Sequence, residues 1–328
     1  MTGATQYPYP TVMSLGELLQ QQPAPQPCLI EPGLLTPQGI LFVGGEPKVG
    51  KSLLVANLAL CLAAGTARAG FEVSAPRRVL ICQFELPVAQ FVARLADMRN
   101  ALGYTADCNL FVDTRSPGHL LSAPQGLNHF VLAARTAAAE VIVLDPLYSA
   151  HDQDENDTRA MAALCQSLLR LRDLAQAALI VVHHVRKSIS RYEVGSAFRG
   201  SSALHAVGDS YMLLTRPSLE LNTLELRFQF RYAAPPQPRL LQLDPRTLWF
   251  SAAGQAPTSP AARKKVDSSD LARILARIGP QARYNELRSR IMNCTDCSKR
   301  TAQLAIARAC QEGRIVQDNG YYRLPLKL

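Results

Sequence analysis

Hydrophobic segments alternate with amphipathic segments between residues 38 and 250. Short apolar runs, typical of buried strands, occupy residues 40–43, 79–84, 109–112, 141–144, 179–183 and 210–214. Helical patterns of apolar positions lie between them. This alternation predicts an α/β fold, with a mostly parallel sheet covered by helices on both faces. Two later segments, 224–232 and 240–250, predict antiparallel strands that end the sheet.

The composition changes at both ends of this region. Residues 1–37 are rich in Pro and Gln and carry one short amphipathic stretch with Leu15, Leu18 and Leu19, which predicts an N-terminal arm. Residues 251–267 have the Ala, Gly, Pro and Ser content of a flexible linker. We therefore expect a main domain at residues 38–250.

Residues 268–328 predict a second, small domain. Helical patterns cover 269–278, 284–292 and the end of 295–313, and a hairpin with Asn319-Gly320 at its turn covers 314–324. Three helices followed by a hairpin are typical of a winged helix-turn-helix. The residues expected on the packed face of its third helix are Ala302, Leu304, Ala305, Ile306 and Ala309.

The positive charge is concentrated in the C-terminal part of this chain of 328 residues. Residues 261–328 hold 14 Lys and Arg against 6 Asp and Glu, whereas residues 1–260 hold 21 against 20. A local excess of this kind indicates a polyanionic partner, although a solvated helix surface gives the same count.

The composition also indicates in which cellular compartment the protein is expected. No apolar run approaches the ~18 residues that a membrane span needs, and the N-terminus has no signal-peptide pattern. Cysteines such as Cys61, Cys82 and Cys165 lie in apolar segments, as buried thiols do in a reducing cytosol. The Cys294/Cys297 pair has the spacing of two zinc ligands, but no histidine follows His205, so we interpret both as ordinary thiols. We expect a soluble cytoplasmic protein without a membrane partner.

The segment ILFVGGEPKVGKSLLVANLAL, residues 40–60, carries the strongest chemical signal. Residues 45–52 match G-x-x-x-x-G-K-[ST] between a strand and a helix, the arrangement in which backbone N–H groups bind phosphate oxygens. Lys51 would contact the β- and γ-phosphates of ATP, and Ser52 would bind Mg²⁺. The predicted nucleotide-binding residues are Gly45, Glu46, Pro47, Lys48, Val49, Gly50, Lys51, Ser52 and Leu53.

Two carboxylates follow predicted strands and complete the expected site. Asp145 ends the run 141–144, as a metal-binding aspartate would, and Glu85 follows the run 79–84, where it would activate water as a general base. The alternatives are a helix-capping aspartate and an ordinary surface charge. The acidic run at 152–157 resembles metal ligands, but we interpret it as a solvated loop and helix start.

Histidine and arginine supply further candidates. A strand at 179–182 ends in His183-His184, of which one should face the nucleotide, because neighbouring strand residues point to opposite faces. Arg199 is placed to reach a phosphate bound by a neighbouring subunit; Arg227 and Arg231 compete for this role. A DNA-phosphate contact and a surface ion pair are the alternatives for Arg199.

Taken together, these residues resemble the RecA-like ATPases of the plasmid RepA type, a group of hexameric replicative helicases. The resemblance covers about residues 28–250 and rests on GGEPKVGKS, Glu85, VIVLDPL, DENDT, LIVVHHVRKS and FRGSSAL in that order. It implies a hexameric ring with nucleotide at the subunit interfaces. The roles it implies are phosphate and Mg²⁺ binding for Lys51 and Ser52, base for Glu85, metal ligand for Asp145, sensor for His184 and trans-acting finger for Arg199.

DNA is the expected partner of the C-terminal domain. In a helix-turn-helix the recognition helix enters the major groove, so the candidate DNA-binding residues are Lys299, Arg300, Gln303, Arg308 and Arg323, with Ser298 and Arg314 nearby. Such domains also dock proteins. We therefore expect a DNA-dependent ring ATPase, with an ATP-controlled DNA-binding regulator or replication initiator as the alternative. A recombinase-like filament and a kinase are more distant hypotheses.

Overall fold

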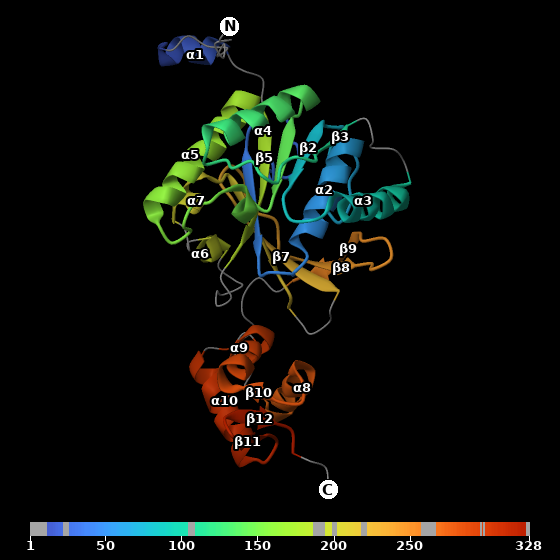
Figure 1. The fold of residues 1–328 in the computed structure, drawn as a ribbon, viewed down its shortest axis with the longest axis vertical. Coiled ribbons are helices and arrows are strands. Elements are labelled where there is room, and N and C mark those ends of the chain that lie inside the picture. Colours follow the sequence, from blue (N-terminus) through green and yellow to red (C-terminus); the bar gives the residue numbers. More distant parts are fainter. Residues whose placement is uncertain are drawn as a thin grey trace.

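The computed structural model of the chain describes residues 12–21, 26–103, 109–185, 194–198, 202–217, 222–256, 267–295, 297 and 299–325. Its centre is a 9-stranded sheet of order β3-β2-β4-β5-β1-β6-β7-β8-β9 (Figure 1). The strands are β1 (Ile40–Gly45), β2 (Val79–Gln83), β3 (Leu110–Asp113), β4 (Val141–Asp145), β5 (Ala178–His184), β6 (Ser210–Thr215), β7 (Thr223–Phe230), β8 (Arg239–Leu243) and β9 (Phe250–Gln255).

The part of the sheet from β3 to β6 is parallel, and β7, β8 and β9 continue it in antiparallel pairs. The predicted mostly parallel sheet is therefore confirmed. Strand β1 lies between β5 and β6, with Gly45 opposite His184 and Leu214. Since the carboxyl ends of parallel strands share one edge, residues that follow β1, β2, β4 and β5 meet there.

Helices cover both faces of the sheet, as the sequence predicted. The long ones are α2 (Lys51–Ala64), α3 (Val88–Leu102), α4 (Pro124–Ala137) and α5 (Thr158–Ala175), and the short ones are α1 (Leu15–Gln21), η1 (Leu147–Ala150), α6 (Val194–Phe198) and α7 (Ser202–Val207). Figure 1 shows α2 and α3 on one side and α4 and α5 on the other. No helix in the described ranges is both long and apolar enough to cross a membrane.

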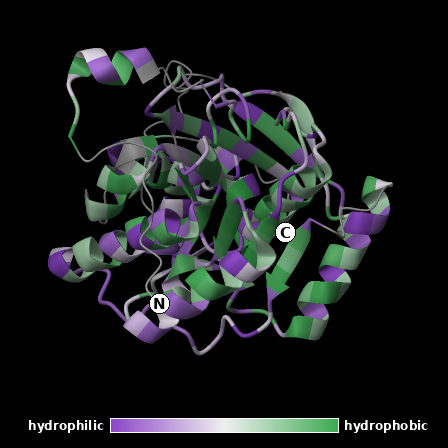
Figure 2. Cartoon of the chain, turned by 90° about the horizontal axis from the view of Figure 1, so that it is seen from above, coloured by the Kyte–Doolittle hydropathy of each residue, from purple (hydrophilic) through white to green (hydrophobic). Residues whose placement is uncertain are grey.

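The alternation of side chains along the strands divides the interior into two cores. Leu41 and Val43 belong to the core under α2 and α3, whereas Ile40 and Phe42 belong to the core under α4 and α5. Because both faces are buried, β1, β2 and β4 are apolar runs rather than alternating ones. Figure 2 shows hydrophobic strands at the centre of the main domain and a mixture of hydrophobic and hydrophilic residues on the surrounding helices.

The C-terminal residues form a separate small unit. It contains α8 (Ser268–Ile278), β10 (Ala282–Arg283), α9 (Tyr284–Thr295), α10 (Lys299–Gln311), β11 (Val316–Asp318) and β12 (Tyr321–Arg323). The three helices pack around a core of their own that includes Leu271, Leu287 and Ile306. The hairpin predicted at 314–324 is present, and Asn319 and Gly320 adopt positive φ angles of 47° and 80° at its turn. Strand β10 pairs with β12 and was not predicted.

Three sequence predictions about the last strands and α10 need correction. Residues 251–255, assigned to the linker, belong to β9, an edge strand whose side chains after Phe250 are exposed and so lack an apolar pattern. The single strand expected at 240–250 is instead β8 and the start of β9, joined by a turn. Leu304, expected on the packed face of α10, is 63% exposed.

Part of the predicted N-terminal arm contributes to the core. Leu29, Ile30, Leu34 and Leu35 are buried, and Glu31 forms a bridge to Glu72 in the main domain. Upstream, Leu15 and Leu19 on α1 are exposed. The main domain therefore begins before residue 38.

The final strands are attached to α2 by a buried side chain. Asn57, 4% exposed, donates from Nδ2 to the Leu248 carbonyl oxygen (3.1 Å) and accepts at Oδ1 from the Phe250 N–H (2.9 Å). Both partners lie in the segment that leads into β9. The side chain thus replaces backbone pairing where the sheet ends.

We expect Asn57→Ala to lower the free energy of unfolding by on the order of 2 kcal/mol, because it leaves the buried Phe250 N–H and the partly buried Leu248 carbonyl group without their side-chain partner. Urea unfolding of the full chain measures the change. Asn128→Ala is the control, since Asn128 is exposed on α4, and a change within about 0.5 kcal/mol is expected there. Equal effects of the two substitutions would contradict this role of Asn57.

Candidate active site

The loop between β1 and α2 forms the floor of the candidate site. Strand β1 ends at Gly45 and α2 begins at Lys51, while Lys48 and Gly50 adopt positive φ angles of 61° and 115°. A Cβ on Gly45 would lie 2.7 Å from the Leu214 carbonyl oxygen, so only glycine fits beside β6. The loop therefore turns tightly and directs the first N–H groups of α2 to the sheet edge, which is the geometry of an anion site.

Lys51 is the central charged group. Its side chain is 4% exposed, and Nζ donates to the carbonyl oxygens of Gly45 and Glu46, both at 2.9 Å. Nζ also lies 3.0 Å from His184 Nδ1. Burial lowers the pKa of Lys51 to about 8, against the opposing effect of nearby carboxylates. A phosphate beside this ammonium would stabilise its charged form.

Ser52 and Asp145 present hard oxygen atoms beside Lys51. Ser52 Oγ donates to Asp145 Oδ1 at 3.0 Å, which brings the end of β4 against the start of α2. Burial raises the pKa of Asp145 to about 6. A buried carboxylate next to a hydroxyl is a donor set that Mg²⁺ fits. The positive charge of the cation would stabilise the ionised form of Asp145.

Glu85 is positioned beside Asp145 by the turn after β2. The N–H of Phe84 donates to the Asp145 carbonyl oxygen (3.1 Å), and the N–H of Leu86 donates to Gln83 Oε1 (2.9 Å). The Glu85 side chain is exposed and accepts from Ser149 Oγ at 3.3 Å. The pKa of Asp145 is raised most by burial and is lowered by the hydrogen bond from Ser52. The negative charge of Glu85 raises it further. A solvent-facing carboxylate thus stands next to the buried one.

The two histidines at the end of β5 separate as expected. His184 contacts Lys51 on the α2 face, so the neighbouring His183 points to the opposite face. Burial lowers the pKa of His184 and brings that of His183 to about 4, so both imidazoles are neutral at pH 7. A neutral His184 can exchange a hydrogen bond with a group that approaches Lys51.

The sequence that forms this site also matches a known protein family. A family model described as an AAA domain covers residues 5–189, more than half of the chain. The chain belongs to this AAA domain family. The matched residues include the 45–52 loop, Glu85, Asp145 and His184.

Solved structures share the fold of this AAA domain protein. One of them, described as an ATPase domain, is 13% identical, with a TM-score of 0.54 over 72% of this chain and 95% of that chain. A DnaB-like replicative helicase, described with its interactions with primase, is 12% identical, with a TM-score of 0.53 over 72% of this chain and 64% of that chain. No curated protein matches the chain. The likeness supports the RecA-like α/β fold.

The arginine candidates of the AAA domain protein differ in their surroundings. Arg199 lies outside the described residues. Arg227 is 5% exposed and pairs with the buried Glu225 at 2.6 Å, which argues against this alternative to Arg199 as the residue that reaches a neighbouring subunit. Arg231 is half-exposed, donates to the Ala206 carbonyl oxygen at 2.8 Å and lies 3.4 Å from Asp209.

The predicted DNA-binding residues lie on the C-terminal unit. Lys299, Arg300, Gln303 and Arg308 are exposed on α10, whereas Arg323 is half-buried on β12. Arg308 pairs with Glu312 at 2.7 Å, and Arg323 pairs with Asp318 at 3.1 Å. Exposed pairs of this kind are weak, so both arginines can still exchange partners.

The acidic run at 152–157 is a loop and helix start, as predicted. Asp157 is the N-cap of α5 and accepts from the N–H groups of Arg159 and Ala160. Asp152 accepts from Ser122 Oγ at 2.7 Å. Through this hydrogen bond, the segment after β4 is attached to the loop before α4.

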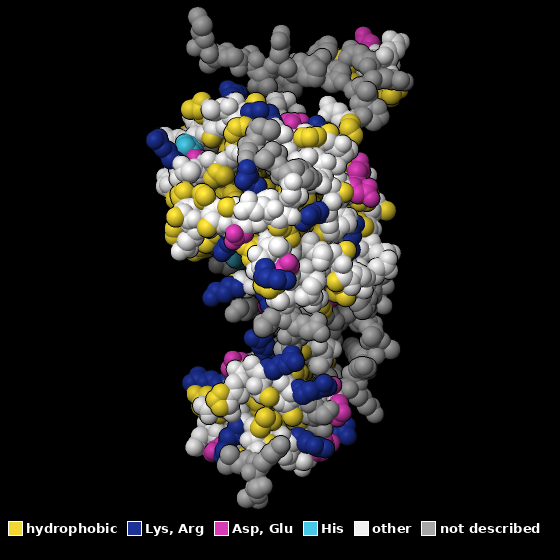
Figure 3. Space-filling view, turned by 90° about the vertical axis from the view of Figure 1, so that its right-hand side faces the viewer, with side chains coloured by type: hydrophobic (Ala, Val, Ile, Leu, Met, Phe, Trp, Pro, Cys, Tyr) yellow, Lys and Arg dark blue, Asp and Glu magenta, His cyan; other side chains and the backbone are white. Residues whose placement is uncertain are grey.

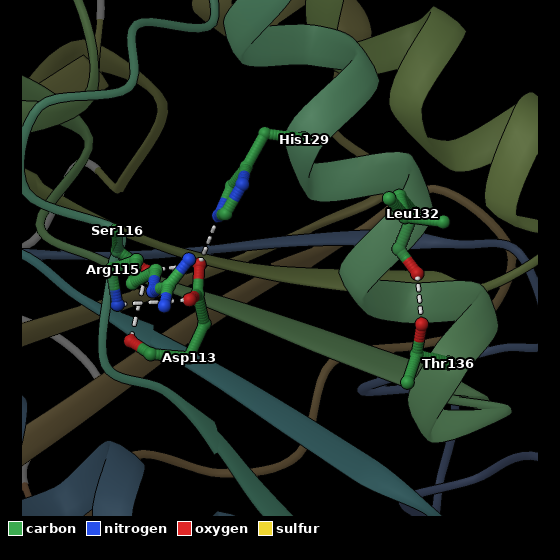
Figure 4. Close-up of polar contacts among 6 residues, drawn as sticks. All are labelled: Asp113, Arg115, Ser116, His129, Leu132 and Thr136. Carbon is green, nitrogen blue, oxygen red and sulfur yellow. Dashed lines mark hydrogen bonds and ion pairs between the residues drawn. The ribbon is translucent and has the colours of Figure 1, made fainter.

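A polar cluster at the end of β3 was not predicted. Asp113 accepts from Ser116 Oγ (2.9 Å) and the Arg115 N–H (3.0 Å) and lies 2.8 Å from His129 Nε2, as Figure 4 shows. His129 stacks on His119 with ring centroids 3.7 Å apart. The cluster fixes the loop from β3 to α4. An Asp directly after a predicted strand was the available signal, but its partner on α4 was not apparent.

We expect Asp145→Asn to stabilise the nucleotide-free protein at pH 8. The pKa of Asp145 is raised from 3.8 to about 6 by burial, so the folded state binds this proton more tightly than the unfolded state. The resulting stabilisation is full below pH 4 and is lost as the pH rises through about 6. Removing the buried charge should therefore raise the free energy of unfolding at pH 8 by on the order of 2 kcal/mol.

Urea unfolding at pH 8 and pH 4, without nucleotide or divalent cations, measures this effect. The gain should largely disappear at pH 4, where wild-type Asp145 is neutral. Asp97→Asn, at an exposed position on α3, is the control and should change stability little at either pH. A loss of stability at pH 8 on Asp145→Asn would overturn the assignment of a buried, destabilising charge.

Proposed function

We propose that this chain is a ring-forming, ATP-hydrolysing, DNA-dependent motor, specifically a replicative helicase of the plasmid RepA type. The observation that carries the proposal is the meeting of Lys51, Ser52, Asp145, Glu85 and His184 at one edge of the sheet. Membership of the AAA domain family and the fold likeness to a solved ATPase domain and to a DnaB-like replicative helicase support it.

The residues divide the hydrolysis of ATP between them. Lys51 and the N–H groups at the start of α2 bind the β- and γ-phosphates. Ser52 and Asp145 would hold Mg²⁺, which would supply positive charge against the phosphate oxygens. Glu85 accepts a proton as water attacks the γ-phosphorus and the bond to the β-phosphate oxygen breaks. Its exposure leaves room for that water, while its neighbour Asp145 is buried.

Two further residues connect hydrolysis to assembly. His184, beside Lys51, contacts the γ-phosphate and reports whether it is present. In the proposed ring of six subunits, Arg199 of one subunit stabilises the charge that develops on a neighbour's nucleotide. Arg231 is the remaining alternative for this role, since Arg227 is buried against Glu225.

The C-terminal unit is proposed to be a winged helix that binds DNA. Its order of helices and its hairpin suit this architecture, and Lys299, Arg300 and Gln303 are exposed on α10 for contact with phosphates and base edges. Thiols such as Cys61, whose pKa burial raises to about 12, suit a reducing cytoplasm, where we propose that the protein works.

A second candidate function follows from the same unit. An exposed basic α10 suits a DNA-binding regulator or replication initiator in which ATP controls assembly without strand separation. The two candidates differ in a single respect, because only the motor converts hydrolysis into displacement of a strand. The decisive assay therefore follows phosphate release and strand displacement together.

We expect single-stranded DNA to increase phosphate release by the full chain at least about tenfold, and a partly duplex substrate to be separated. Lys51→Ala should abolish both activities. Glu85→Gln should keep ATP binding while reducing turnover by about 10² to 10⁴, the usual contribution of a general base. Asp97→Asn, away from the phosphate loop, should leave both activities unchanged.

The outcomes separate the candidates. ATP turnover and duplex binding without strand displacement would favour the regulator. Turnover that survives both Lys51→Ala and Glu85→Gln would reject the proposed active site itself. A monomer that hydrolyses ATP at the full rate, seen by light scattering, would reject the ring.

A further inference from the structure

An apolar side chain lies on the solvent face of α10. Leu304, near the middle of this helix, is 63% exposed, although its neighbours Ala305 and Ile306 are buried. Single exposed apolar residues are common on protein surfaces, so exposure alone does not indicate a contact. The surroundings of Leu304 decide what it can bind.

Leu304 belongs to a continuous exposed stripe. Arg300, Gln303, Leu304, Ala307 and Arg308 follow one another at spacings of one or three residues, and all are exposed. The opposite face of α10 packs into the core of the C-terminal unit through Ala302, Ala305, Ile306 and Ala309. The stripe therefore faces outward along most of the helix.

The charge on this helix favours an anionic partner. The sequence of α10, KRTAQLAIARACQ, contains three basic residues and no Asp or Glu. Within the described part of the chain, no ion pair engages Lys299 or Arg300, and Arg308 pairs with Glu312, which lies beyond the helix. Figure 3 shows Lys and Arg side chains distributed over the surface of this unit. Duplex DNA has the complementary charge.

The centre of the stripe has the chemistry that reads an A·T pair. Gln303 can pair with the adenine edge in the major groove, and an apolar side chain contacts the thymine methyl group. A protein partner would need a wider apolar surface, but the other exposed positions on the stripe are Arg, Gln or Ala. A small residue at Ala307 lets the helix approach the groove closely.

We infer that Leu304 is a specificity-determining residue that contacts a thymine 5-methyl group when α10 lies in the major groove of duplex DNA. This inference rests on the proposed DNA binding of the C-terminal unit and adds the base that is read. Lys299 and Arg300 bind phosphates and set the position of the helix. Leu304 then distinguishes thymine from bases without the methyl group.

The test compares two duplexes with the full chain. Both have identical G·C ends and an alternating A·T centre, and in the second every thymine of the centre is replaced by uracil, which pairs alike but lacks the methyl group. An excess of single-stranded oligo(dC) occupies the proposed motor site. Affinities are measured by fluorescence anisotropy at one fixed salt concentration, because phosphate contacts depend on salt.

Wild type should bind the thymine duplex about fourfold more tightly than the uracil duplex, the factor for one buried methyl group. Leu304→Ala should bind both duplexes equally, at about the affinity of wild type for the uracil duplex. Leu324→Ala is the matched control, since Leu324 is an exposed leucine of the same unit outside α10, and it should keep the fourfold preference. Unchanged thermal unfolding of Leu304→Ala checks its folding.

Equal binding of the two duplexes by wild type would overturn the inference while leaving DNA binding by this unit intact. A thymine preference that persists in Leu304→Ala would overturn it as well. If wild type binds neither duplex, both the inference and the proposed role of the C-terminal unit fail, whereas ATP hydrolysis stimulated by single-stranded DNA would still support the motor.

Discussion

A buried ammonium group at the carboxyl edge of a parallel sheet organises this molecule. Lys51 lies at the first position of α2 with almost no exposure, and its partners are two loop carbonyl oxygens and His184. An ammonium so placed is only partly compensated, which is why its pKa falls to about 8. A site of this kind gains stability from an added anion, so its geometry and its electrostatics indicate the same ligand.

The order of the strands brings the other groups to this ammonium. Strand β1 lies beside β5, and β4 lies between β5 and β2. His184 and Asp145, the last residues of β5 and β4, therefore meet Glu85, which follows β2, at one edge. Their environments differ, since Asp145 is buried against Ser52 whereas Glu85 is exposed. Two carboxylates in unlike surroundings can therefore take different roles. The polar cluster of Asp113 holds a loop that contacts the segment after β4, which extends this fixed edge.

Much of this arrangement was predictable because it depends on local patterns. Buried parallel strands are apolar runs, the 45–52 loop has a glycine pattern with one backbone solution, and a carboxylate directly after a strand must emerge at the edge. Strand β9 escaped prediction because an edge strand with exposed side chains has no apolar signal. Leu304 escaped because its helix is rich in alanine, so the pattern does not fix which face is packed.

Contacts between residues far apart in the sequence were the other features that could not be predicted. Arg227 is buried with Glu225 on a strand that pairs with β6, and an Arg two residues from a Glu looks the same on a solvated strand. The contact of Asp113 with His129 joins a strand end to a helix across an irregular loop. The packing of residues 29–35 into the core was hidden by the Pro-rich composition of the preceding arm. Sequence patterns locate such groups but do not pair them.

Calorimetric titration of the full chain with Mg²⁺-ATP and with AMP, before and after Lys51→Ala, tests the central claim most directly. The account predicts that wild type binds ATP at least about 100-fold more tightly than AMP, and that Lys51→Ala removes this difference by losing affinity for ATP alone. Equal affinities of wild type for ATP and AMP, or unchanged ATP binding after Lys51→Ala, would contradict the claim that this ammonium holds a triphosphate.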